Sequence, residues 1–370
     1  MRNLKLTTVF AALLIMAATM IAPTTAEAGT QRYNALDVRS AGMGGAGVTI
    51  HRGFSAMLYN PATLAYQEKL RVDVFDFQIN VDRDLGGMMK FYDDNETLFD
   101  AYNDTTLAAQ QKLLDGLSEW DDSWLGIGSY GHLGLRYMNF AAGYYGDVKI
   151  EFKTDKGIFD PRVHEYGRAD FVFAFGGAFE LPESVTSSLL PNPLHAGAVL
   201  KIVERYELRE LRLSASEVNI DDAYDTLVSK SDWGFGMDLG FKYDLKPDKV
   251  TLGMRIQDLV ADIGEDRPPV IVNIGASMRT RKGVLLAADF NDVFFHDGEN
   301  LFNKLHFGAE MGLSKVFTVR AGVGQGYPSI GLGVFLGVVE IDGAMFGTER
   351  SENPGGDGEF SYAGRLRLGF

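Results

Sequence analysis

The densest motif in the chain is a glycine cluster near its N-terminus. Gly42-x-Gly44-x-x-Gly47 has the spacing of a dinucleotide-binding loop, and the acidic Glu68 follows about twenty residues later. That loop needs a strand before it, a long helix after it and a βαβ unit around it. Pro61 interrupts any such helix, and no alternation of strands and helices follows. The glycines therefore favour close backbone packing or positive φ over a nucleotide site.

Side chains that could act in catalysis or hold a metal are not grouped. The six histidines are scattered, without the spacing typical of metal ligands, and the absence of Cys removes thiolate ligands and disulfides. No G-x-S-x-G nucleophile elbow is present. Asp121-Asp122 and Asp221-Asp222 lie in predicted loops, where carboxylates are more often solvated than catalytic. The sequence predicts no enzyme activity, no metal and no cofactor.

From about Lys69 onward, apolar and polar residues alternate with a period of two. In residues 234–243, GFGMDLGFKY, Phe235 and Leu239 fall on one face and Asp238 and Lys242 on the other. Similar segments predict thirteen strands: 69–81, 131–146, 166–181, 194–208, 233–245, 248–260, 270–280, 283–294, 303–313, 316–324, 328–336, 338–347 and 359–370. Bacterial single-chain barrels have an even number of strands, so one more is expected, in residues 208–216 or 86–92.

A soluble β-sandwich would show the same alternation, but three features favour a barrel in lipid. The predicted strands run about ten residues, which suffices to cross a bilayer at a tilt. The polar face combines glycine with charge, as a barrel lumen does, and aromatic residues lie near strand ends, as at a membrane interface. The predicted fold is an all-β, transmembrane, antiparallel β-barrel over residues 69–370.

Residues 29–68 are expected to form a plug, a segment that threads through the lumen of this barrel. Its predicted gate residues are Gly42, Gly44, Gly45, Gly47, Asn60 and Pro61. Parity places nine charges on the lumen face: Asp238, Arg255, Asp289, Glu310, Arg320, Glu340, Asp342, Arg365 and Arg367. Buried charges need partners, so we expect them to pair with one another or with the plug. Whether they only hold the plug or also line a ligand route stays open.

The N-terminus and the composition indicate export. Residues 1–28 read as a signal peptide, with Arg2 and Lys5, an apolar stretch and a small-x-small cleavage site at residues 26–28; a membrane anchor is the alternative. No later stretch has eighteen consecutive apolar residues, so a membrane protein of this sequence must be a closed barrel. The formal net charge of −15 argues against nucleic acid as a partner. The predicted location is the bacterial outer membrane.

Two further regions depart from the simple strand pattern. Residues 93–120 have leucines at roughly helical spacing and predict helices in a long loop, whereas residues 147–165 and 217–232 predict further long loops. The chain ends in SYAGRLRLGF, with Phe370 closing an alternating last strand. A terminal aromatic of this kind resembles the signal by which outer-membrane barrels are assembled. It implies the barrel-assembly machinery and outer-membrane lipid as partners.

The stretch "SAGMGGAGV" followed by "AMLYNPATLAY" resembles the N-terminal signature of the FadL long-chain fatty-acid transporter superfamily. That superfamily includes toluene transporters, PorV proteins and TraF-like outer-membrane proteins. Thr63-Leu64 stands where transporters usually have Gly-Leu, which tilts the resemblance towards the TraF-like branch. The resemblance implies fourteen strands and an N-terminal plug.

Two functions follow from this resemblance. The first is passive uptake of hydrophobic small molecules, fatty-acid-like or aromatic, with the plug as gate. The second is an envelope interaction protein, similar to PorV or TraF-like proteins, that transports nothing. An apolar pocket between plug and wall favours the first function, and a sealed, charge-filled lumen favours the second.

Overall fold

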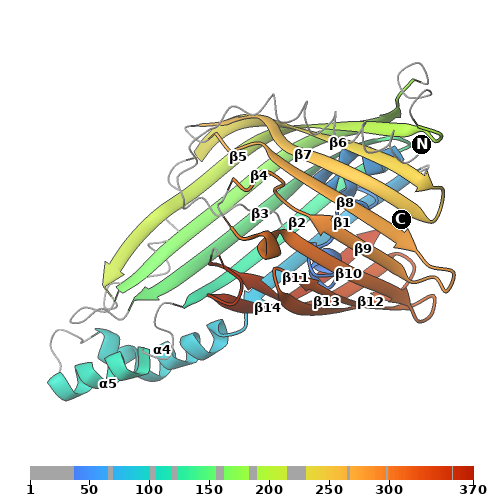
Figure 1. Cartoon of the computed structure of the whole chain (residues 1–370). Coiled ribbons are helices and arrows are strands. Elements are labelled where there is room, and N and C mark those ends of the chain that lie inside the picture. Colours follow the sequence, from blue (N-terminus) through green and yellow to red (C-terminus); the bar gives the residue numbers. More distant parts are fainter. Residues whose placement is uncertain are drawn as a thin grey trace.

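The computed structural model is a closed antiparallel β-barrel of fourteen strands (Figure 1). The structure describes residues 37–65, 70–100, 106–117, 123–155, 162–182, 190–214, 231–264, 267–296, 299–351 and 353–370. The predicted signal peptide and most of the predicted 217–232 loop lie outside these residues. Each strand pairs with its neighbours in sequence, and β1 pairs with β14 to close the barrel.

The strands differ greatly in length around the barrel. Their bounds are β1 Leu70–Asp82, β2 Trp124–Tyr137, β3 Phe140–Asp155, β4 Arg162–Glu180, β5 Leu194–Ser214, β6 Ser231–Lys246, β7 Val250–Ile263, β8 Ile271–Arg279, β9 Leu285–Phe290, β10 Leu305–Gly312, β11 Phe317–Gly324, β12 Tyr327–Phe335, β13 Val339–Glu349 and β14 Gly358–Gly369. β4 and β5 have 19 and 21 residues, whereas β9, β10 and β11 have 6, 8 and 8. We call β2–β7 the tall wall and β8–β12 the low wall.

The structure has fourteen strands, one more than the thirteen predicted from alternation, because one predicted strand is a hairpin. The stretch expected as a single strand, 131–146, contains the end of β2 and the start of β3, which turn at Met138 and Asn139. Met138 has φ 53°, the left-handed conformation that such a tight turn requires. Neither proposed site of the missing strand holds it, because 86–92 belongs to a helix and 208–214 extends β5. Much of the loop predicted at 147–165 is likewise strand, in β3 and β4.

The predicted alternation between an apolar outer face and a polar lumen is confirmed. Phe173, Phe175 and Ile202 on the tall wall are each more than half exposed, as expected for side chains that face lipid. Asp170 and Arg205 lie on the same two strands but on the opposite face. They are buried, point inward and pair with each other. Because side chains alternate along a strand, this pattern fixes the register of the wall.

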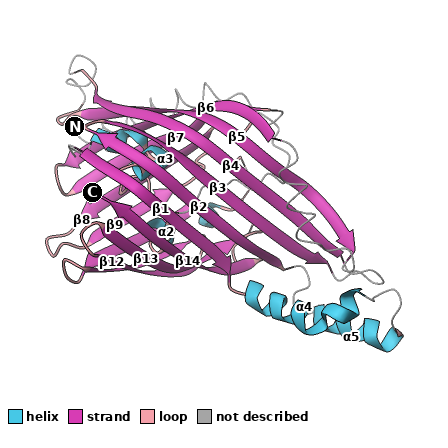
Figure 2. Ribbon diagram, turned by 180° about the vertical axis from the view of Figure 1, so that it is seen from behind, coloured by secondary structure: helices cyan, strands magenta, loops and turns pink. Residues whose placement is uncertain are grey.

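Two helices, α4 Leu85–Asp100 and α5 Leu107–Leu117, stand outside one end of the barrel (Figures 1 and 2). They begin earlier than the predicted 93–120 segment, since α4 starts three residues after β1. Leu113 and Leu117 pack against Phe91 and Leu98, so the pair has a small apolar core of its own. Among the described residues, no helix is long and apolar enough to span a membrane.

The N-terminal segment lies inside the barrel, as the blue ribbon in Figure 1 shows. It contains three short elements: α2 Val38–Ala41, α3 Ser55–Tyr59 and the 3-10 helix η1 Pro61–Ala65. Another short 3-10 helix, η4 Leu301–Lys304, lies outside this segment and precedes β10. α2 contacts β12–β14, and η1 contacts β4–β6 on another side. The segment therefore crosses the lumen from wall to wall.

Candidate functional site

The plug, here residues 37–65, is surrounded by glycines of the barrel wall. At each of these positions a side chain would run into the plug within about 3 Å. They come from ten strands: Gly134, Gly143, Gly176, Gly197, Gly240, Gly253, Gly275, Gly308, Gly322, Gly324 and Gly331. We call this set the glycine belt. Since Gly lacks a Cβ, the belt lets plug and wall touch backbone to side chain or backbone to backbone.

Along the low wall the plug touches the strands backbone to backbone. A Cβ on Gly322 would lie 2.3 Å from the Met43 carbonyl carbon, and one on Gly308 would lie 2.5 Å from the Met43 carbonyl oxygen. Gly308 and Gly322 are direct cross-strand partners, so together they make a slot for Met43. Met43 is fully buried and packs with Ala46, and with Ala287 of β9. The plug is therefore tightly seated on this side.

The predicted gate glycines differ in their backbone conformation, since Gly44 and Gly45 have positive φ and Gly42 and Gly47 do not. Gly42 faces Gly331, whereas Gly47 faces the Tyr59 ring of the plug itself. Gly44 and Gly45 have φ of 67° and 86°, which side chains rarely adopt. A Cβ on Gly44 would also lie 2.6 Å from the backbone of β11.

Asn60 and Pro61 form the turn that leads into η1. The side chain of Asn60 is fully buried, donates a hydrogen bond to the Phe241 carbonyl of β6 and accepts one from the Ala62 amide. Pro61 abuts Gly197 on β5, where a Cβ would meet its carbonyl carbon at 2.4 Å. The Asn-Pro-Ala segment thus anchors the second end of the plug to the tall wall.

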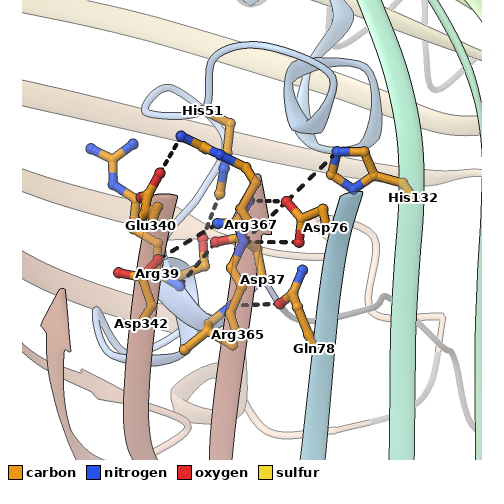
Figure 3. Close-up of polar contacts among 12 residues, drawn as sticks. Asp37, Arg39, His51, Asp76, Gln78, His132, Glu340, Asp342, Arg365 and Arg367 are labelled. Carbon is orange, nitrogen blue, oxygen red and sulfur yellow. Dashed lines mark hydrogen bonds and ion pairs between the residues drawn. The ribbon is translucent and has the colours of Figure 1, made fainter. Parts of the chain in front are cut away.

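A network of charges holds the first end of the plug (Figure 3). Arg365 of β14 lies between Asp37 of the plug, at 3.1 Å, and Asp76 of β1, to which its Nε donates at 3.0 Å. Gln78 of β1 accepts a hydrogen bond from the Val38 amide at 3.0 Å. Because these groups are buried, removing one partner would leave the others unpaired.

The same network continues towards the low wall. Arg39 of α2 donates through Nε and Nη2 to Glu310 at 2.7 Å, and Arg320 donates to both Glu310 and Asp342. Arg367 pairs with Glu340 nearer the end of the barrel. All five of these predicted lumen charges therefore face inward.

Asp289 and His306 hold the glycine loop of the plug directly. Asp289 Oδ2 accepts hydrogen bonds from the amides of Gly47 and Val48, at 2.5 and 2.8 Å. His306, the cross-strand partner of Asp289, lies with Nδ1 2.6 Å from the Gly44 carbonyl oxygen. The two side chains clamp the loop from adjacent strands.

Asp238 and Arg255 belong to a separate cluster on the tall wall. Asp238 accepts from Lys201 Nζ at 2.8 Å and from Arg255 Nη2 at 3.0 Å. A bulge in β7 turns Asp258, with φ 52°, towards the same group, so that its amide donates to Asp238 and its carboxylate pairs with Lys201. Sequence reasoning gave the first two residues but missed Lys201 and Asp258.

A cavity of about 180 Å³ lies between the plug and the barrel wall, mostly along the tall wall but reaching Ile271 of β8 and Asp289 of β9 on the low wall. On the plug side it is lined by Met57, Leu58 and Tyr59 of α3. Its apolar wall residues include Val172, Val199, Val203, Ile263 and Ile271. Its charged residues are Asp147, Arg168, Asp170, Lys201, Arg205, Asp238, Arg255, Asp258 and Asp289. The cavity thus has an apolar surface beside a nearly balanced set of charges.

Most lining residues of this cavity were not singled out from the sequence. Arg168, Asp170 and Lys201 lie on segments that were predicted as strands, and their parity alone would have placed them inside. Tyr130 gave no such signal, because the predicted strand started one residue later, at 131. Across the described part of the chain, no group of three or more His, Asp or Glu side chains is arranged to hold a metal.

Solved structures of other proteins share this architecture. No family profile and no curated protein matches the sequence. Among solved structures, a mutant of the TodX monoaromatic hydrocarbon channel matches with a TM-score of 0.52 and 12% identity, covering 89% of this chain and 97% of that one. The CymD monoaromatic hydrocarbon channel matches with a TM-score of 0.50 and 12% identity, covering 90% and 97%.

The chain has the fold of FadL-type outer-membrane channels. TodX is the toluene transporter of Pseudomonas putida, and both it and CymD are FadL-family outer-membrane transporters. The chain shares with them the closed fourteen-strand barrel and the internal N-terminal segment. At 12% identity the likeness concerns the fold, so ligand and mechanism rest on the site itself.

Proposed function

We propose that the protein is a plug-gated outer-membrane channel for passive uptake of hydrophobic small molecules. The observation that carries this proposal is the cavity between α3 and the tall wall, where Met57, Val172, Val199 and Val203 supply apolar lining. Apolar surface beside a gate is what a hydrophobic solute needs to leave water before it crosses. The solved barrels of this fold are channels rather than enzymes, which supports the proposal.

The proposal requires the plug to move or loosen. The glycine belt leaves little room along the low wall, whereas on the tall wall the cavity beside α3 interrupts the contact between plug and wall. We infer that a solute passes between α3 and β4–β5, with the predicted gate glycines Gly44 and Gly45 as part of the low-wall contact that stays fixed.

Uptake of toluene and of a fluorescent fatty acid into cells without other such channels tests the proposal. Val199→Phe fills the cavity from the wall and should reduce uptake to near that of cells lacking the protein. Leu200→Phe is the matched control, because Leu200 is the next residue, faces outward and is 59% exposed. Equal uptake of both probes with wild type and with no protein would contradict the proposal.

The second candidate, an envelope interaction protein, is favoured by a different observation. The plug is held by the glycine belt and by buried ion pairs, while α4 and α5 stand clear of the barrel. In that case α4 and α5 or the barrel rim would bind another envelope protein, and Val199→Phe would leave that binding unchanged. Contacts with outer-membrane lipid, and recognition of Phe370 by the barrel-assembly machinery, are part of either proposal.

A further inference from the structure

Three neighbouring turns at one end of the barrel carry an excess of exposed cations. They connect β6 to β7, β8 to β9 and β10 to β11, and they lie at the end where the C-terminus is, away from α4 and α5 (Figure 1). Residues 245–250, 279–284 and 312–317 contain six Lys or Arg and one acidic residue, in a chain whose formal net charge is −15. We call the six cations, all exposed, the basic rim: Lys246, Lys249, Arg279, Arg281, Lys282 and Lys315.

The three turns lie next to one another. The amide of Arg279 donates a hydrogen bond to the Lys249 carbonyl at 2.8 Å, which connects the first turn to the second. β9 pairs with β10, so the second turn lies beside the third. Two other short turns at the same end, residues 138–139 and 336–338, carry no charge. The basic rim is therefore an arc under β6–β11 and does not extend around the whole barrel.

Cations in the lumen are paired, whereas those of the basic rim are not. Arg320 and Arg365 each donate to buried carboxylates of neighbouring strands. Within the part of the chain that the structure describes, none of the six rim cations forms an ion pair, and the Arg279 side chain donates only to the Gly283 carbonyl. Exposed cations without carboxylate partners create a positive potential, so this arc attracts anions.

The basic rim borders apolar side chains that face lipid. Each turn has an exposed apolar residue at or next to the end of its first strand: Leu245, Met278 and Leu313. These lie one or two residues from a rim cation. Basic side chains at the edge of an apolar belt lie at the level of the lipid head groups, where their stems cover apolar surface and their charges meet phosphate. The three turns have only three, five and four residues, so they offer little projecting surface to a folded protein.

From this arrangement we propose that the basic rim binds the head groups of anionic phospholipids, with phosphatidylglycerol as the test case. Short turns of bacterial barrels face the periplasm, so the lipids are those of the periplasmic leaflet. The inference rests on the membrane location that the proposed function includes, but it does not depend on transport. The cations of the three turns contact the phosphates, and the apolar residues beside them contact the acyl chains.

Electron spin resonance of labelled lipids around the reconstituted full-length barrel tests this inference. Phosphatidylcholine vesicles carry a trace of spin-labelled phosphatidylglycerol or spin-labelled phosphatidylcholine, and the motionally restricted fraction gives the relative affinity of each lipid. At low salt we expect phosphatidylglycerol to associate at least about twofold more tightly, averaged over the barrel perimeter. The ratio should fall towards one at about 0.5 M NaCl, because salt screens exposed charges.

Neutralising one cation in each turn should remove most of the preference. The rim variant combines three substitutions: Lys249→Gln, Lys282→Gln and Lys315→Gln. The matched control removes three exposed cations at the opposite end: Lys90→Gln, Lys112→Gln and Arg267→Gln. Both variants have the same net charge, so they differ only in where the cations were lost. The control should keep the wild-type ratio.

Three outcomes would overturn the inference: equal affinity of both lipids for the wild type, a preference that survives in the rim variant, or an equal loss in the control. Polyglutamate that binds the wild type but not the rim variant, without any lipid preference, would assign the rim to an acidic protein instead. Uptake of toluene and the fluorescent fatty acid is measured separately in cells. If uptake is absent while the lipid preference holds, the transport proposal fails and this inference stands.

Discussion

The plug meets two different walls. Against the low wall it touches glycine backbone with no space between, in a slot formed by Gly308 and Gly322. Against the tall wall it also touches glycine, as where Pro61 meets Gly197, but beside α3 it is separated from the wall by a cavity lined with valines and paired charges. Contacts with backbone cannot yield without moving a strand, whereas side chains around a cavity can change rotamer. The comparison teaches that both walls hold the plug, and that the cavity beside α3 is where passage or binding can occur.

The largest expected effect comes from adding one methyl group to the low wall. Gly322→Ala places a Cβ 2.3 Å from the Met43 backbone, so the free energy of unfolding in lipid vesicles should fall by more than about 3 kcal/mol. Gly236→Ala is the tall-wall counterpart, where the Cβ meets side chains alone, the end of Lys201 at 3.0 Å and Asp258 Oδ1 at 3.8 Å. Its cost should be within about 1 kcal/mol. Similar losses in both variants would show that the walls do not differ.

A smaller loss is expected from the charge cluster of the tall wall. Asp238→Asn leaves Lys201 and Arg255 with a neutral partner in a buried site, and should lower the free energy of unfolding by about 3 kcal/mol or somewhat less. Asp262→Asn is the control on the same wall. Its carboxylate is half exposed and 3.9 Å from Arg267, so the change should be below about 0.5 kcal/mol. Denaturant titration decides between these values.

The smallest perturbation probes accessibility and leaves the fold unchanged. Because the chain has no cysteine, single substitutions report cleanly on each side of the plug. Leu58→Cys faces the cavity, whereas Ala46→Cys is fully buried against the low wall. A small thiol reagent added to intact cells should modify Leu58→Cys at least about tenfold faster. Faster labelling of Ala46→Cys would reverse the comparison, and equal labelling after denaturation controls for reactivity.

Local alternation in the sequence was enough to predict the antiparallel barrel. The parity of residues 234–243 placed Asp238 inside and Phe235 outside, as the structure has them, because a strand has a period of two in any sheet. The same parity put Asp289, Glu310, Arg320 and Arg365 in the lumen. The hairpin at Met138 was missed because no Gly, and no Asn-Gly or Asp-Gly pair, marks it.

The sequence by itself determined the barrel, its inner and outer faces and the presence of a glycine-rich segment that packs closely. Only the tertiary structure decided which part of the plug each wall glycine contacts, since Gly322 and Met43 are far apart in the chain and are brought together by barrel closure. It also decided that Lys201, Asp238 and Asp258 share one cluster, because a bulge in β7 turns Asp258 inward. Alternation is a local property of each strand, whereas the cavity depends on how unequal strands and the plug fit together.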